Sequence, residues 1–322
     1  MPPAIRRTLS GVAMLLAIGP GLLRSMQPDP AALVPLFRQA LEERTKLYGT
    51  DDARVARAAR DLGLLLRSLH RNAEAEPLFL QSLAIDTRVL GEKDRQVGAD
   101  LENLASVVAD PSEALSLTER AAHHPDPEIS ARNLARLAEH APRGKAAGLY
   151  RQALEREEQA SGKESERVAV RLNDLALALP PKQAEPLLRR ALQIQVTKLG
   201  VRHPETATTQ NNLANVLLAM GEVARAEPLL RQALGTLEAM LGRNHLRVAA
   251  ASSNLGDVLR AKGNLAGARR LYERTLAIDE AVYGKNHPEV AADLRNLAGL
   301  LDEMGQAAEG RKLLDRAERI GR

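Results

Sequence analysis

The chain has 322 residues, of which 44% are hydrophobic and only 2% aromatic, and it contains no Cys and no Trp. The lack of Cys excludes disulfides, thiolate metal sites and cysteine nucleophiles. Lys and Arg outnumber Asp and Glu by only 45 to 41, and the resulting net charge of +4 is too weak to argue for nucleic acid as a partner. A core of Leu and Ala with few aromatic residues favours closely packed helices over a β-sandwich.

Residues 1–28 form a leader that differs in composition from the rest of the chain. Within it, the segment Arg6–Leu23 places two arginines before an apolar run that is interrupted at Gly19-Pro20-Gly21. A basic start and a short apolar run are typical of a secretory signal peptide. No Ala-x-Ala cleavage motif follows, however, and Met26 is an alternative start for a cytoplasmic protein.

Two interpretations of the leader therefore stay open, a signal peptide and a disordered segment. We favour a cytoplasmic protein, and we expect export if Arg6–Leu23 is a signal peptide. Contact with a membrane is expected only through an uncleaved leader.

Residues 29–322 are predicted to form one repeat array. The sequence Asn-Leu-Ala at 212–214 returns as Asn-Leu-Gly at 254–256 and as Asn-Leu-Ala at 296–298, at a period of 42 residues. A fixed period of this length predicts a solenoid, in which each unit covers the apolar face of the next. We expect one opening helix at about Pro30–Tyr48 and seven helix pairs after it. A Leu marks the centre of the first helix of each pair: Leu62, Leu104, Leu134, Leu175, Leu213, Leu255 and Leu297.

One pair illustrates how the helices are bounded. Apolar residues at helical spacing predict a first helix over about Pro204–Met220, and Pro204 suits its first turn. Gly221 can adopt the left-handed conformation that ends a helix. The second helix is expected over about Ala224–Leu241, where small residues allow a close helix crossing.

The units at about 95–180 are degenerate. The pair around Leu104 has Asp110-Pro111-Ser112 where the last three pairs have the inter-helix Gly, and the pair around Leu175 shortens its first helix at Pro180-Pro181. Proline cannot continue a helix interior, so these positions are predicted helix boundaries. We expect an altered superhelical twist there; sequence drift in a spacer is the interpretation that we favour, and a hinge between pairs one to three and pairs four to seven is the alternative.

Leu213-Ala214, Gly221, Ala226, Leu230 and Ala233 match the spacing of the tetratricopeptide repeat. The period, the Asn-Leu-Ala core and the Leu-Gly-x-x-His-Pro linker resemble the kinesin-light-chain variety of that repeat. The resemblance implies an all-α fold, a right-handed superhelical α-solenoid. It also implies a non-enzymatic protein–protein interaction scaffold that binds an extended peptide or partner segment in its concave groove.

A polar residue precedes the repeat Leu in every pair. Asn is a mediocre residue for a helix interior, so its return at one helical phase suggests a task. By the resemblance, this face lines the groove, where Asn amides hydrogen-bond a peptide backbone and Arg favours acidic groups. The alternative is that Asn braces neighbouring repeats and Arg is merely solvated. The residues predicted to contact a partner are Asn103, Asn133, Asn211, Asn212, Asn215, Asn254, Asn296, Arg60, Arg67, Arg132, Arg260 and Arg295.

No catalytic, metal-binding or cofactor-binding motif occurs in the sequence. His203, His245 and His287 recur one repeat apart, each at the entry to a first helix, so we interpret them as linker residues. We therefore predict a protein that is not an enzyme and uses no cofactor.

A protein or peptide is the predicted partner. Nucleic acid is disfavoured because single-strand binders stack bases on aromatic side chains, and this chain has four Tyr, two Phe and no Trp. Two further functions stay open: a regulatory or adaptor subunit that docks a separately encoded enzyme or signalling protein, and an exported scaffold of envelope proteins.

Overall fold

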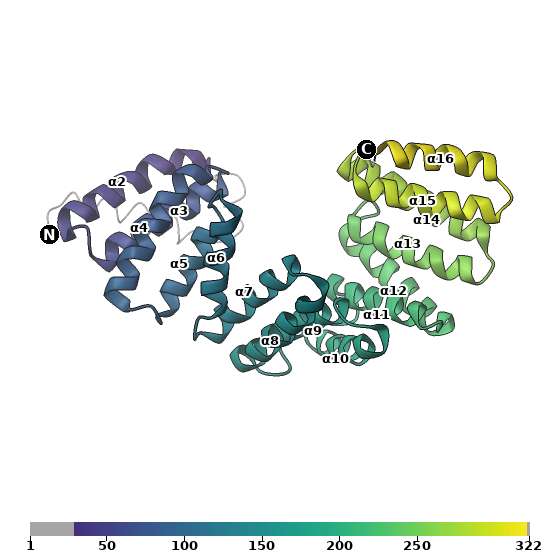
Figure 1. Ribbon diagram of the computed structural model, residues 1–322, viewed down its shortest axis with the longest axis horizontal. Coiled ribbons are helices and arrows are strands. Elements are labelled where there is room, and N and C mark those ends of the chain that lie inside the picture. Colours follow the sequence, from purple (N-terminus) through teal and green to yellow (C-terminus); the bar gives the residue numbers. More distant parts are fainter. Residues whose placement is uncertain (1–28, 321–322) are drawn as a thin grey trace. The chain divides into compact units, whose positions relative to one another are not determined.

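The computed structural model describes residues 29–320, which form fifteen α-helices and no strand (Figure 1). The predictions for residues 1–28 lie outside the described residues. The expected all-α solenoid, one opening helix followed by seven helix pairs, is confirmed. The helices are α2 (Pro30–Tyr48), α3 (Ala53–Ser68), α4 (Asn72–Leu90), α5 (Arg95–Ala105), α6 (Pro111–Ala122), α7 (Pro127–His140), α8 (Arg143–Ser161), α9 (Glu166–Leu177), α10 (Pro181–Leu199), α11 (Pro204–Ala219), α12 (Val223–Leu241), α13 (Leu246–Ala261), α14 (Leu265–Tyr283), α15 (Pro288–Glu303) and α16 (Ala307–Ile320).

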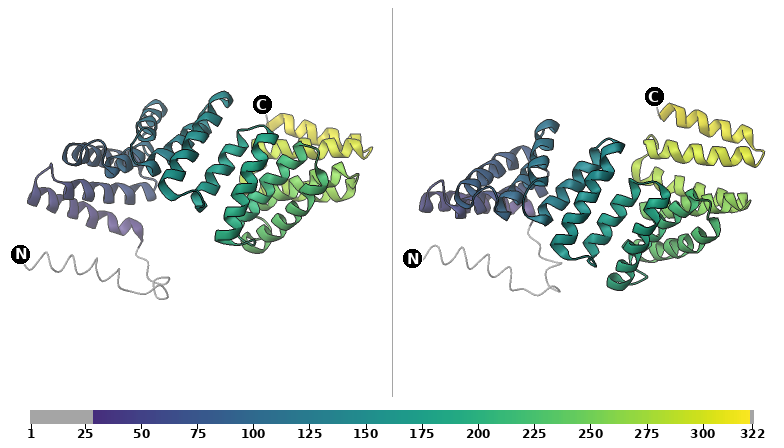
Figure 2. Two further views of the ribbon diagram at one scale, coloured as in Figure 1. Left: turned by 90° about the horizontal axis from the view of Figure 1, so that it is seen from below. Right: turned by 60° about the horizontal axis from the view of Figure 1, so that its bottom comes forward.

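The chain divides into two compact units, residues 1–133 and residues 134–322, and the division falls inside α7. Within each unit, successive helices lie side by side and alternate in direction (Figures 1 and 2). We call the odd-numbered helices α3 to α15 the first helices and the even-numbered helices α4 to α16 the second helices, after their order in each pair.

The core of residues 29–133 lies between α3, α4 and α5. Leu62 and Leu66, one turn apart on α3, pack in one cluster with Phe79 of α4 and Leu101 and Leu104 of α5. Residues three or four apart share one face of a helix, so α3 presents a continuous apolar stripe to both neighbours.

The core of residues 134–320 is divided into several clusters that follow one another along the helices α9 to α16. Ala226 and Ala233 on α12 are completely buried, as are Ala191 on α10 and Ala268 on α14. These small side chains let the two helices of a pair approach closely, as the sequence indicated.

Two pairs use a glycine opposite an aromatic ring. A Cβ on Gly63 would lie 2.7 Å from Cε1 of Phe79, and a Cβ on Gly256 would lie 2.7 Å from Cε1 of Tyr272. The equivalent positions of the α11/α12 pair are Ala214 and Leu230. A larger side chain on the second helix is therefore matched by a smaller one on the first.

The recurring histidines are helix caps. Nδ1 of His203 accepts from the backbone N–H of Glu205 at 3.2 Å, and His245 and His287 accept in the same way at the start of α13 and α15. Each ring satisfies one of the backbone donors that a helix leaves free at its N-terminus. The interpretation of these histidines as linker residues is confirmed, and Gly221 has the expected left-handed φ of 79°.

A repeated arginine ties successive second helices together in residues 134–320. The guanidinium forms an ion pair with a Glu near the end of the preceding second helix and donates to a backbone carbonyl of the loop that follows. The three copies are Arg190 with Glu158 and Lys163, Arg274 with Glu238 and Arg243, and Arg316 with Glu280 and Lys285.

The middle of the chain has the shortest helices of the described residues, with 11 residues in α5 and 12 in α6 and α9, against 16 to 19 in α11 to α14. A hinge in this part of the chain stays an open alternative to sequence drift. We expect amide hydrogens in residues 110–143 to exchange faster than those in residues 204–276. Shorter helices make fewer buried apolar contacts, so less free energy is needed to open them locally. Hydrogen exchange followed by mass spectrometry measures this difference. Equal protection of the two segments would remove the hinge.

Candidate partner-binding face

Two of the three asparagines that precede a repeat Leu in residues 134–320, Asn212 and Asn254, bridge neighbouring first helices. The side-chain N–H of Asn212 on α11 donates to Oδ1 of Asn173 on α9 at 3.1 Å. The side-chain N–H of Asn254 on α13 donates to Oδ1 of Asn211 on α11 at 2.8 Å. The amide nitrogen of Asn173 in turn donates to Thr209 of α11 at 2.8 Å. Asparagine amides that were predicted to contact a partner therefore join neighbouring first helices of the fold.

These bridges leave part of each amide unused. Asn212 and Asn254 are half-buried, and no described residue donates to their Oδ1 atoms. An acceptor on each of two successive first helices stays available beside the bridge. Asn211 is only 9% exposed, and its side chain faces the bridge.

Three predicted residues of this face are exposed and have no side-chain hydrogen bond or ion pair with the described residues: Asn215 on α11, and Arg295 and Asn296 on α15. Arg260 on α13 behaves differently, because its Nε donates to both carboxylate oxygens of Glu303 on α15, at 3.0 and 3.1 Å. Arg260 lowers the pKa of the Glu303 carboxyl through these hydrogen bonds. The pair joins two neighbouring first helices.

In residues 29–133, Arg60 lies inside the fold. Its Nε donates to Oδ1 of Asp100 on α5 at 2.6 Å, and its Nη2 pairs with Asp86 on α4. The side chain of Arg60 is 12% exposed, and those of Asp86 and Asp100 are 2% and 0% exposed. Burial raises the pKa of Asp86 to about 6, although Arg60 pulls it down. Arg60 forms ion pairs with two buried carboxyl groups and is not placed to reach a partner.

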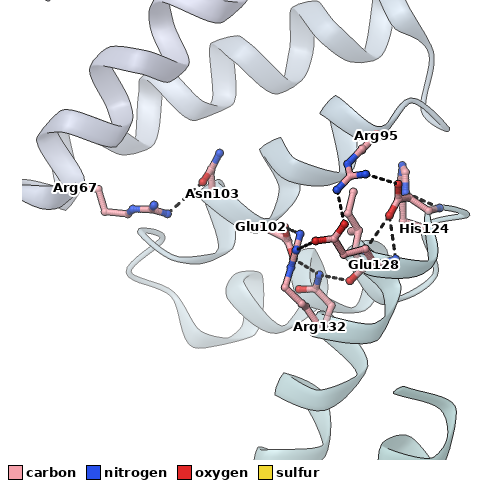
Figure 3. A network of polar contacts seen from close by, with 10 residues as sticks. Arg67, Arg95, Glu102, Asn103, His124, Glu128 and Arg132 are labelled. Atoms are coloured by element: carbon pink, nitrogen blue, oxygen red, sulfur yellow. Dashed lines mark hydrogen bonds and ion pairs between the residues drawn. The ribbon is translucent and has the colours of Figure 1, made fainter. Parts of the chain in front are cut away.

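Arg67 joins the first helices α3 and α5. Its Nη1 donates to Oδ1 of Asn103 at 3.2 Å (Figure 3). The same Nη1 donates to the hydroxyl of Ser106 at 2.9 Å. Both Arg67 and Asn103 are half-buried.

Arg132 and Asn133 on α7 converge on one carboxylate of α5. Arg132 pairs with Glu102 at 2.8 Å and with Glu128 at 3.0 Å, while Nδ2 of Asn133 donates to Glu102 at 2.7 Å (Figure 3). Asn133 is completely buried. This network joins α5 to α7 and leaves the amide of Asn133 no access to a partner.

The sequence analysis missed the acidic partners of these arginines. Asp100 follows Arg60 by 40 residues, and Glu303 follows Arg260 by 43 residues, each about one repeat away. Opposite charges about one repeat apart on neighbouring first helices are the signal that could have found them, because neighbouring units lie side by side.

Within residues 29–320, no group of three or more His, Asp or Glu side chains is close enough to hold a metal ion. No helix in that part of the chain is sufficiently long and apolar to cross a membrane.

Comparison with known proteins identifies the repeat. The family model for the tetratricopeptide repeat matches residues 29–88, 181–239 and 247–322. No curated protein matches the sequence.

Among solved structures, a putative kinesin light chain with TPR-like repeats from Podosopora anserina is 26% identical, with a TM-score of 0.49, over 62% of this chain and 97% of that one. BtubC (BKLC) from P. vanneervenii is 20% identical, with a TM-score of 0.40, over 91% of each chain. A Rap protein complexed with Competence and Sporulation Factor is 14% identical, with a TM-score of 0.54, over 89% of this chain and 76% of that one.

Proposed function

The chain belongs to the tetratricopeptide repeat family, and from this premise we propose that it is a protein-interaction scaffold that grips an extended segment of a partner protein. The gripping surface is the face of α11, α13 and α15 that carries Asn212, Asn215, Asn254, Arg295 and Asn296. We call this surface the amide face.

One observation carries the proposal: amide groups recur on three successive first helices with hydrogen-bonding capacity that the fold does not use. A peptide unit offers one donor and one acceptor, and an Asn side chain complements both. Ala250 and Ala261 on α13, one and two turns from Asn254, are exposed and place only small side chains there. Each hydrogen bond contributes about 0.5–1.5 kcal/mol net, so several together fit micromolar binding.

Arg295 gives the amide face a free positive charge. It is exposed and unpaired among the described residues, and an arginine of this kind forms paired hydrogen bonds with a carboxylate. We therefore place an acidic side chain or a C-terminal carboxylate of the partner near α15. Arg60, Arg67, Arg132 and Arg260 are left out of the binding surface, because their carboxylate and amide contacts join helices.

The stability of the asparagine variants distinguishes amides that brace the fold from amides that are free to bind a partner. We expect Asn296→Ala to change the free energy of unfolding by less than about 0.5 kcal/mol, because this exposed side chain has no described partner. Asn212→Ala and Asn254→Ala each remove a bridge and are expected to cost about 0.5–1.5 kcal/mol. Urea denaturation followed by circular dichroism measures both. An equal loss for all three variants would show that Asn296 also braces the fold.

The binding experiment uses the exposed residues, so that lost binding is not confused with lost folding. The triple variant Asn215→Ala, Arg295→Ala, Asn296→Ala is compared with wild type in affinity capture from lysate of the native organism, and captured proteins are identified by mass spectrometry. We expect at least one partner to fall about tenfold or more, since losing a few hydrogen bonds and one ion pair removes more than about 1.4 kcal/mol.

The matched control carries Gln152→Ala, Gln193→Ala and Arg311→Ala, which remove two exposed amides and one exposed arginine from the second helices α8, α10 and α16. This control is expected to retain the partner. If the amide-face variant retains every partner while the control loses one, the second helices carry the binding and the proposal is wrong.

A further inference from the structure

Two pairs of aspartates occupy the same positions of the repeat; Asp86, Asp100 and Asp293 are buried, and Asp279 is half-buried with a buried Oδ1. Asp86 on α4 meets Asp100 on α5, and Asp279 on α14 meets Asp293 on α15. In both cases the first Asp lies near the end of a second helix and its partner lies on the first helix that follows. The two aspartate pairs therefore share their positions in the repeat, and they differ in the charged residues around them.

The first pair has a built-in cation. Arg60 on α3 contacts both carboxylates, and the hydroxyl of Ser82 donates to Asp100 at 3.1 Å. With both aspartates ionised, this buried cluster carries a net charge of only −1.

The second pair has no such cation. Ser253 stands two residues before the repeat Leu of α13, as Arg60 does on α3, and a serine brings no charge. Asp293 is 8% exposed, and no donor from the described residues reaches the buried Oδ2 of Asp293 or the buried Oδ1 of Asp279. The other charged groups that act on the pair are Glu289 on α15 and, on Asp279, His287 before that helix.

Two buried carboxylates in contact cannot both be ionised without a large electrostatic cost. A proton on one of them turns an acceptor into a donor and lets the two groups share a hydrogen bond. Burial and the neighbouring Asp279 accordingly raise the pKa of Asp293 to about 7, far above the usual value near 4.

The Asp279–Asp293 pair lies where the last helix pair packs against the rest of the array. Val290, Leu294 and Ala317 form the cluster between α15 and α16, and Leu276 of α14 packs against it. Asp279 and Asp293 lie across the same junction between α14 and α15, which attaches the last helix pair to the array.

We propose that the Asp279–Asp293 pair is a proton-operated joint: one shared proton holds the helix pair α15–α16 against α14, and ionisation of both carboxyl groups loosens it. Because Arg295 and Asn296 lie on α15, the joint sets how firmly that end of the array is ordered near neutral pH. The inference does not depend on the amide face being a binding surface.

The direction of the pH effect follows from proton linkage. Between about pH 4 and pH 7 the folded joint keeps a proton that the unfolded chain has released, so the joint is most stable at the acid end. Its stability declines as the pH rises through the raised pKa of Asp293 and levels off above it. One proton corresponds to about a tenfold rise in the opening equilibrium constant per pH unit within this window.

The test is hydrogen exchange of the full chain at pH 5.5 to 8, corrected for the intrinsic exchange rate. We expect protection of α15 and α16 to fall as the pH rises, while protection of α11 and α12 stays constant. Asp293→Asn removes the ionisable group, and Ser253→Arg supplies the cation that Arg60 supplies in the first pair. Both variants are expected to flatten the pH dependence of α15 and α16.

The matched control is Asp302→Asn, which removes an exposed carboxylate from the same helix and should keep the wild-type slope. If Asp293→Asn folds poorly, Ser253→Arg still decides the question. The proposal is overturned if wild-type protection of α15 and α16 does not change from pH 5.5 to 8, or if Ser253→Arg keeps the full slope. Protection at pH 8 that millimolar Mg²⁺ restores in wild type but not in Asp293→Asn would also overturn it, by assigning the pair to a metal ion.

Discussion

Arg60→Met is expected to lower the free energy of unfolding of the first compact unit by about 3–5 kcal/mol, the range seen when one partner of a buried ion pair is removed. The variant leaves Asp86 and Asp100 facing each other at 2% and 0% exposure without their shared cation. One of the two carboxyl groups must then hold a proton at neutral pH or the unit must open. The loss is expected to be smaller at pH 5 than at pH 8, because protonation removes the repulsion.

The measurement is urea denaturation followed by far-ultraviolet circular dichroism, with hydrogen exchange of α3, α4 and α5 to locate the loss. Arg57→Met is the matched control, because Arg57 is an exposed arginine on the same helix with no described contact, and it should change stability by less than about 0.5 kcal/mol. Adding Asp86→Asn and Asp100→Asn to Arg60→Met should restore part of the loss. If Arg60→Met is as stable as Arg57→Met, Arg60 does not stabilise the fold, and it is again a candidate for contact with a partner.

Phe79→Ala is expected to destabilise the same unit by a comparable amount, about 3–5 kcal/mol. The ring of Phe79 is completely buried in the cluster with Leu62, Leu66 and Leu104. Removing it takes apolar contacts from α3, α4 and α5 at once and leaves a cavity that the surrounding helices can fill only in part.

A double-mutant cycle with Gly63 tests whether ring and glycine are matched. Gly63→Ala alone brings a Cβ to 2.7 Å from the ring and should cost about 1–3 kcal/mol through overpacking. Combined with Phe79→Leu, it recreates the pairing of Ala214 with Leu230 in the α11/α12 pair, so the double variant should be more stable than the sum of the two single changes predicts. Additive losses would show that the two positions are packed independently.

The helices were predictable because their signals are local. The opening helix was expected at Pro30–Tyr48 and has those bounds. The second helix of the illustrated pair was expected to begin at Ala224 and begins at Val223. Apolar periodicity, a proline at the first turn, a histidine cap and a left-handed glycine each act within a few residues of the chain.

The contacts of the polar residues were not predictable to the same degree. Asn212 and Asn296 are equivalent in the repeat, yet Asn212 bonds Asn173 on the preceding first helix whereas Asn296 is exposed. The difference arises on the preceding first helix, since the position that carries Asn211 opposite Asn254 carries Ser253 opposite Asn296. Whether an amide braces the fold or stays free depends on a residue one repeat away.

The sequence by itself determined the class of fold, the number of helix pairs and the family, because a fixed period with local helix signals leaves one way to bury each apolar face. Only the tertiary structure showed which polar residues form hydrogen bonds or ion pairs within the fold. Arg60 and Asn133 share their helical phase with exposed residues of other repeats, but they lie beside carboxylates that the neighbouring helices bring within hydrogen-bonding distance. Whether such a side chain is exposed or paired depends on the residues that a neighbouring helix places beside it, and therefore on how the two helices pack.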